Sequence, residues 1–181
     1  MSAAQPILRR LAEVDWGPRQ DVSDLLAAVT VGDHGEREQA WGDLWDCIQH
    51  EGTIDEAVLP AVPVLVALAD WHDYPERVHA IVLLREIATA DGVAPTHDHE
   101  QFAELRAALV AGSRHLAARW RSEPPAVRRA LVWLMSAVPE VRVRCHDLID
   151  ATLPARHRAA WEAVLVGRSD GGELENWVYG G

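Results

Sequence analysis

His79 and Glu86 are the two residues whose types and spacing best suit acid–base chemistry. They stand seven positions apart in a stretch with helical apolar spacing, and Leu83 lies between them, so a helix would carry all three on one side. A histidine titrates near neutral pH, and a nearby carboxylate could orient its ring. If the chain is an enzyme, this pair would do its acid–base work. We favour the alternative, a solvated face with incidental charges, and commit to no catalytic residue.

The densest group of potential metal ligands is the run His97-Asp98-His99-Glu100. A zinc site needs three or four ligands that converge in tetrahedral geometry, and this run matches no established ligand spacing. Asp98 as the N-cap of a following helix explains the same residues, since anionic groups stabilise helix N-termini. His97 and His99 are therefore weak metal candidates, and we predict neither a metal nor a cofactor. The sequence also lacks a phosphate-binding loop, a dinucleotide-binding glycine pattern and a nucleophile elbow.

Tryptophan dominates the aromatic residues, with eight indoles against two tyrosines and one phenylalanine. Trp133 lies off the apolar stripe that Leu131 and Leu134 mark, and beside Arg129, so we predict an exposed or groove-lining indole there. Two other indoles follow it as candidates, at positions 71 and 161. The predicted binding surface comprises Trp71, His79, Glu86, Arg129, Trp133 and Trp161.

Two further tryptophans are predicted to lie in the core. Trp41, Leu44, Trp45 and Ile48 recur at i, i+3, i+4 and i+7, which places them on one face of a helix. We expect Trp41 and Trp45 to pack against the apolar helix over residues 57–69. A ligand shelf is the alternative for these two indoles.

Helical apolar spacing runs along the whole chain and predicts an all-α fold of eight to nine helices, without strands. Thr53 and Glu56 have the spacing of a capping box, so a helix is expected to start there. Residues 62–68 are apolar on every side, which predicts a buried central helix. Pro60 and Pro63 are expected to distort its first turns, because neither has an N–H to donate.

The chain is expected to form one domain of ordinary size over residues 1–166, followed by a tail over residues 167–181. The tail is rich in glycine, but Leu174, Trp177 and Tyr179 could anchor it to the domain. The apolar run 57–69 is too short to span a bilayer. The start of the chain shows no signal-peptide pattern, and the two cysteines fall in helical patterns, so we expect reduced thiols in a cytoplasmic protein.

The charge is divided unevenly along the chain. Residues 1–100 hold 19 acidic residues against 6 arginines, and residues 101–181 hold 9 against 11. The acidic half should repel phosphate backbones, which disfavours DNA and RNA as partners. A basic protein or peptide, or a cationic small molecule, remains compatible with this charge.

Four helix starts share a proline followed closely by an arginine, which is an internal repeat. Proline fits the first helical turn, and the arginine could reach carbonyls or carboxylates of the neighbouring unit. The four starts are Pro75-Glu76-Arg77, Pro125-Ala126-Val127-Arg128, Pro139-Glu140-Val141-Arg142 and Pro154-Ala155-Arg156.

The run from Glu123 to Ala130, E-P-P-A-V-R-R-A, resembles the P-x-V-R-x-x-A core of HEAT repeats. The stretch from Val14-Asp15-Trp16 through Ile48-Gln49-His50-Glu51-Gly52-Thr53 to Pro60-Ala61-Val62-Pro63 further resembles a group of uncharacterised bacterial HEAT-like proteins. Those proteins carry a glutamine where this chain has Glu51. The resemblance covers most of residues 14–165 and implies a HEAT-like α-solenoid, a fold that mainly serves as a curved protein-binding scaffold and carries no catalytic residues across.

Three hypotheses about function follow. The first is a non-catalytic scaffold whose acidic, tryptophan-containing concave face binds a protein or peptide, in particular a basic one. The second is an enzyme acting on a small molecule by acid–base or cyclisation chemistry in a Trp-lined pocket between the helices. The third, nucleic-acid binding, would need an arginine-lined groove, and the acidic first hundred residues argue against it.

Overall fold

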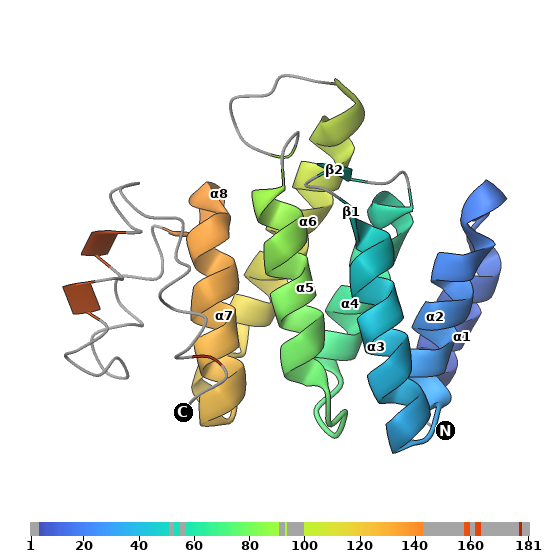
Figure 1. Cartoon of the computed structure of the whole chain (residues 1–181). Coiled ribbons are helices and arrows are strands. Elements are labelled where there is room, and N and C mark those ends of the chain that lie inside the picture. The colour runs from blue at the N-terminus through green and yellow to red at the C-terminus, as the bar shows by residue number, and fades with distance from the viewer. Residues whose placement is uncertain are drawn as a thin grey trace.

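The chain folds into α-helices, which confirms the predicted all-α class (Figure 1). The structure, a computed structural model, describes residues 4–50, 53–54, 57–90, 93 and 100–142, and residues 158, 159, 162, 163 and 178 as isolated positions. Within these residues the α-helices are α1 (Ala4–Glu13), α2 (Gln20–Val31), α3 (His34–Ile48), α4 (Val58–Asp70), α5 (Arg77–Thr89), α6 (Glu100–Ala118), α7 (Pro125–Ala137) and α8 (Pro139–Arg142). Two 3-10 turns, η1 (Gly17–Arg19) and η2 (Trp120–Ser122), precede α2 and α7.

A pair of two-residue strands joins α3 to α4, where the sequence predicted no strand and an earlier helix start. β1 (Gln49–His50) pairs antiparallel with β2 (Thr53–Ile54), and His50 faces Thr53. Thr53 therefore does not cap a helix, which begins only at Val58, and Glu56 lies outside the described residues. Two residues per strand are too few to produce an alternating pattern, so sequence periodicity has no means of detecting this pair.

The long helices lie side by side in two rows (Figure 1). One row contains α3, α5 and α7, and the other contains α4 and α6 behind them; α4 also contacts α1 and α2. No residue of α4 is exposed, which confirms the predicted central helix, and the helix continues through Pro63. Helix α5 is equally central, because it packs on α3, α4, α6 and α7.

The predicted core face of α3 is confirmed. Trp41, Leu44 and Ile48 are buried, and Trp45 packs partly buried against the same core. The helix packs mainly on α2, and the Trp41 indole reaches the segment between α4 and α5, where its Nε1 donates to the hydroxyl of Tyr74 over 3.2 Å. That hydroxyl donates in turn to the carbonyl of Val29 over 2.7 Å, so one buried chain of hydrogen bonds links α2, α3 and the segment before α5.

Two of the arginines that follow proline at the helix starts, Arg77 and Arg142, reach neighbouring segments as the repeat predicted, whereas the buried Nε of Arg128 has no hydrogen-bond partner among the described residues. Arg77 is the first residue of α5; its Nε donates to the Ala69 carbonyl over 2.8 Å and its Nη1 lies 2.7 Å from Oε2 of Glu123. Arg142 donates to the carbonyl of Ser136. Pro125 and Pro139 are the first residues of α7 and α8, while the Pro154 start lies outside the described residues.

Gly112 on α6 allows this helix to approach α4 closely. A Cβ at position 112 would lie 2.5 Å from Cγ2 of Val66, a β-branched side chain with little freedom to move. Gly112→Ala is therefore expected to lower the free energy of unfolding, measured by urea titration, by about 1–3 kcal/mol. Alanine normally stabilises a helix relative to glycine by up to about 1 kcal/mol, so the sign of the effect tests the close approach.

Gly42 on α3 provides the matched control for this substitution. Nothing lies within 4 Å of a Cβ at position 42, so Gly42→Ala should stabilise the protein. A Val66→Ala change should recover part of the Gly112→Ala loss by making room between α4 and α6. Stabilisation by both alanine substitutions would contradict the packing of α6 on α4.

One residue of the predicted tail is part of the core: Val178 is buried with the apolar residues of the helices. The anchors proposed for the tail, Leu174, Trp177 and Tyr179, lie outside the described residues, as does Cys145. Cys47 is a free, partly buried thiol. Among the described helices, none is both long and apolar enough to cross a membrane.

Candidate functional site

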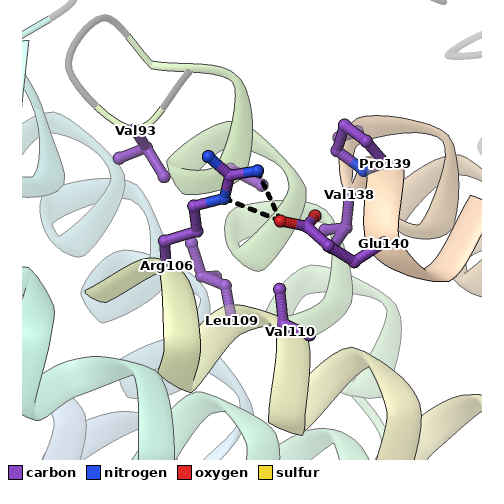
Figure 2. A pocket seen from close by; sticks show the side chains of 9 residues that line it. Val93, Arg106, Leu109, Val110, Val138, Pro139 and Glu140 are labelled. Carbon is purple, nitrogen blue, oxygen red and sulfur yellow. Dashed lines mark hydrogen bonds and ion pairs between the residues drawn. The ribbon is translucent and has the colours of Figure 1, made fainter. Parts of the chain in front are cut away.

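A half-open pocket lies where the end of α5, the middle of α6 and the α7–α8 junction meet (Figure 2). Its empty space is about 240 Å³, including the mouth that opens to solvent. Most of the lining is apolar, and several lining residues belong to the buried core. The lining residues are Ala88, Val93, Arg106, Leu109, Val110, Ala137, Val138, Pro139 and Glu140.

The two charged residues of the pocket are bonded to each other. Nε of Arg106 on α6 donates to Oε1 of Glu140 on α8 over 2.8 Å, and Nη2 contacts the same oxygen. Their side chains are 33% and 31% exposed, so the pair lies at the surface of the pocket and is neither buried nor fully solvated. Because the two charges offset each other, the pocket offers a nearly neutral rim above an apolar floor.

The size and lining of the pocket suit an apolar group better than a reacting substrate. Ligand pockets for small molecules usually enclose roughly 300–1,000 Å³, and this space is smaller even when its mouth is included. Leu109, Val138 and Ala88 are each buried and form its inner wall. The arrangement is therefore a shallow apolar recess, with polar contacts available only at the rim.

The sequence did not predict this pocket, although two of its residues, Pro139 and Glu140, belong to a predicted helix start. The lining comes from the ends of α5 and α7, the start of α8 and the middle of α6, which meet only in the folded chain. No sequence spacing connects Ala88 with Ala137, so periodicity alone could not have found the site.

His79 lies in the first turn of α5 and is exposed, although its ring stacks on a neighbouring indole. The ring stacks on Trp41, with centroids 5.8 Å apart and planes 25° from parallel. Partial burial lowers the pKa of its imidazole below the usual value, and the carboxylates of Glu76 and Glu38 oppose that shift. Trp71, another predicted surface residue, stacks on Tyr74, so it is linked to His79 through Trp41 and Tyr74.

The lowered pKa of His79 makes stability depend on pH. Because the folded state disfavours the imidazolium, the unfolded chain binds this proton more readily, and stability should fall as pH drops below the unfolded value of about 6.5. An NMR titration of the His79 ring should therefore give a midpoint below about 6.5. Trp41→Leu should move that midpoint upward by uncovering the ring, and an unchanged midpoint would contradict burial as the cause.

His79 and Glu86 do not form the acid–base pair that their spacing suggested. Seven helical residues separate them by about 10 Å along the axis. Leu83, which lies between them, is fully buried in the core and leaves no open cleft there. Glu86 instead forms an ion pair with the guanidinium of Arg85, the next residue on α5. The geometry expected for catalysis by this pair is therefore absent.

The prediction of an exposed indole at Trp133 is wrong. Trp133 is 2% exposed and lies in the core, with Cζ of Arg85 4.5 Å from the centroid of its ring. The error has a physical cause: α7 is buried over every residue from Ala130 to Ser136, so residues off the Leu131–Leu134 stripe also face protein. Arg129, one turn before Trp133, is partly exposed.

The remaining predicted residues divide as follows. Glu86 and Trp133 are brought together through Arg85, whereas His79 and Trp71 lie near the other end of α5. Trp161, His97 and His99 lie outside the described residues. Across the part of the chain that the structure describes, His, Cys, Asp and Glu side chains form no group of three that could hold a metal ion.

Comparisons with known proteins identify no relative of this chain. No protein-family model, no curated protein and no solved structure matches the chain. The resemblance to HEAT repeats therefore rests on the sequence motifs, and remains a prediction.

Proposed function

We propose that this chain is a HEAT-like α-solenoid that binds a protein or peptide and catalyses no reaction. The packing of successive helices into two rows, with α5 and α7 in one and α4 and α6 in the other, supports this proposal (Figure 1). So does the repeated use of an arginine at a helix start to hold the preceding segment. In such a stack each helical unit contacts its neighbours, and the surface is preformed for binding.

The observation that carries the proposal is the self-neutralised pocket between α5, α6 and α8. Its charged residues, Arg106 and Glu140, are bonded to each other, and its inner wall is aliphatic. General acid–base catalysis needs a titratable group poised to exchange a proton with the substrate, whereas a binding site needs an apolar recess with a polar rim. This pocket has the second composition.

The exposed acidic face of α2 and α3 favours a basic partner. Asp24, Glu36, Asp43 and Asp46 are all exposed on these helices. Two of the nearby arginines are engaged, since Arg19 bonds to Asp21 and Arg37 bonds to Glu76. The face should therefore attract cationic segments over long range and raise their association rate at low salt.

Selection of peptides from a random displayed library on the purified full chain tests the proposal. We expect enrichment of basic peptides with an aliphatic residue. The native chain is compared with the charge-reversed variant Asp43→Lys/Asp46→Lys, in which two exposed carboxylates on α3 become cations. It should bind the selected peptides roughly tenfold more weakly at low salt, and the difference should shrink at high salt. Failure to enrich any peptide would overturn the proposal, and binding unaffected by the reversed charges would remove the basic partner from it.

The enzyme alternative is not favoured by any observation. It required a Trp-lined pocket and a His79–Glu86 pair. The lining of the described pocket contains no tryptophan, and a buried leucine separates the two residues.

A further inference from the structure

We propose that copies of this chain associate head to tail, with an arginine surface at the α6–α7 connection of one copy against the acidic face of α2 and α3 of the next. This inference rests on the function proposed above, because it identifies the basic partner of the acidic face as a second copy of the chain. The arginine surface comprises Arg114, Arg121, Arg128 and Arg129.

The α6–α7 connection concentrates positive charge in an acidic chain. Residues 114–129 contain five arginines and one acidic residue, Glu123, whereas the whole chain has a net charge of −11. Glu123 is buried and paired with Arg77, so it does not offset the charge at the surface. One of the five arginines, Arg119, contacts Asp70. The other four therefore determine the charge of this surface.

The four residues of the arginine surface lack the carboxylate partners that other arginines have. Among the described residues, none of their guanidinium groups forms a hydrogen bond or an ion pair, whereas Arg19, Arg37 and Arg106 each bond to a carboxylate. In the same part of the chain, the Nε atoms of Arg128 and Arg129 are shielded from solvent without a hydrogen-bond partner. A partly desolvated cation without a partner is costly, so an anionic surface against these two arginines would stabilise them.

Helix α3 carries the opposite charge at a similar density. Residues 33–46 contain five acidic residues and one arginine, Arg37, which is bonded to Glu76. The five acidic residues are all exposed, and they are Asp33, Glu36, Glu38, Asp43 and Asp46. Each copy therefore presents one cationic and one anionic surface, and the two are complementary in charge.

The two surfaces of one copy lie too far apart to bind each other. Helices α3 and α7 belong to the same row, α5 lies between them, and α6 lies behind (Figure 1). The surfaces can therefore meet only between copies, and a contact between two different surfaces repeats from one copy to the next. At physiological salt the Debye length is about 8 Å, so the repulsion between the net charges of two copies is screened until the surfaces are close.

The same charge pattern favours a second copy over a nucleic acid. The exposed carboxylates of α3 would repel a phosphate backbone that extended across the molecule. A second copy instead presents its carboxylates along one helix and carries its own arginine surface away from the contact.

Sedimentation velocity of the native full chain over a range of concentrations tests this inference, and we expect concentration-dependent association. Arg114→Glu/Arg121→Glu reverses two exposed charges of the arginine surface and should weaken the association roughly tenfold. The matched control is Arg9→Glu/Arg10→Glu, at exposed positions on α1. It changes the net charge by the same amount and should leave the association unchanged.

Reversal of the acidic face gives the complementary variant. Asp43→Lys/Asp46→Lys should also weaken self-association roughly tenfold. An equimolar mixture of this variant with Arg114→Glu/Arg121→Glu should regain the association, because each surface then meets one of opposite charge. That recovery would also show that both variants are folded. A native chain that stays monomeric, association that neither variant weakens, or a mixture that does not recover would each overturn the inference.

The library selection separates this inference from the proposed function. If the native chain stays monomeric while basic peptides are enriched, the inference fails and the proposed function stands. If the copies associate through these surfaces while no peptide is enriched, only the binding of separate peptides fails. A single-stranded oligonucleotide, followed by fluorescence anisotropy, tests the other occupant. Binding that is lost in Arg114→Glu/Arg121→Glu, without self-association of the native chain, would overturn the second copy in favour of a nucleic acid.

Discussion

Glu123→Gln is expected to lower the free energy of unfolding by about 3–5 kcal/mol, because it leaves a buried cation without its partner. Arg77 and Glu123 are 4% and 3% exposed at their side chains, and Nη1 of Arg77 lies 2.7 Å from Oε2 of Glu123. The glutamate precedes α7 and the arginine begins α5, so the pair joins two helical units inside the protein. Urea titration followed by circular dichroism measures the loss.

A double substitution distinguishes the destabilisation caused by an unpaired buried charge from the net contribution of the ion pair to stability. Arg77→Met/Glu123→Leu removes both charges and should be more stable than Glu123→Gln, since apolar replacements of a buried pair are often tolerated. Arg77 also donates to the Ala69 carbonyl, so the double variant still loses that hydrogen bond. If the double variant were no more stable than Glu123→Gln, the buried charge would not be the source of the destabilisation.

A neighbouring exposed ion pair is the matched control for the buried one. Asp70 at the end of α4 contacts Nη1 of Arg119 at 2.6 Å and Nε2 of His115 at 3.2 Å, and all three side chains are at least 31% exposed. Solvent screens such contacts, so Asp70→Asn should cost less than about 1 kcal/mol. A comparable loss at both sites would show that burial does not decide the strength of these pairs.

Much of the fold could be predicted because helices leave a local signature. Leu105, Leu109 and Leu116 recur at helical spacing and are buried on α6, and the apolar run of residues 62–68 lies within a central helix, as predicted. The arginine of Pro75-Glu76-Arg77 reached a neighbouring unit as the repeat suggested, although its partner Glu123 is far away in sequence. Local chemistry identified the donor, and only the folded chain identified the acceptor.

The candidate site was less predictable because it depends on contacts between distant segments. The hypothesis for His79 and Glu86 used helical spacing and placed Leu83 on the same side of the helix. The burial of Leu83 depends on the helices packed against α5, which the spacing does not reveal. The pocket combines the ends of α5 and α7 and the start of α8 with the middle of α6, and spacing within one helix carries little information about how these segments meet. Both cases show that a helix wheel identifies which residues share a side, but not which sides the neighbours cover.

Trp133→Ala should likewise lower the free energy of unfolding by about 3–5 kcal/mol, the usual range for removing a buried tryptophan. The indole contributes core packing between α5 and α7, and its ring face also receives the guanidinium of Arg85, 4.5 Å from the centroid. Truncation would leave a cavity and deprive a largely buried cation of that contact. Trp133→Phe, which retains an aromatic face, should cost less than Trp133→Ala.

Two readouts distinguish this structural role from the binding role that the sequence suggested. If Trp133 is a core residue, Trp133→Ala should shift the urea midpoint strongly, and its folded fraction should bind selected peptides as the native protein does. Trp71→Ala is the matched control, because that indole is only partly buried and stacks on Tyr74. Loss of the stacking should lower the free energy of unfolding by about 0.5–1.5 kcal/mol, in addition to the effect of the lost burial. An unchanged urea midpoint for Trp133→Ala together with lost peptide binding would instead indicate that the indole is exposed and contacts the peptide. Because α7 is buried on more than one side, we expect the opposite result: Trp133 holds α7 against α5 and does not face solvent.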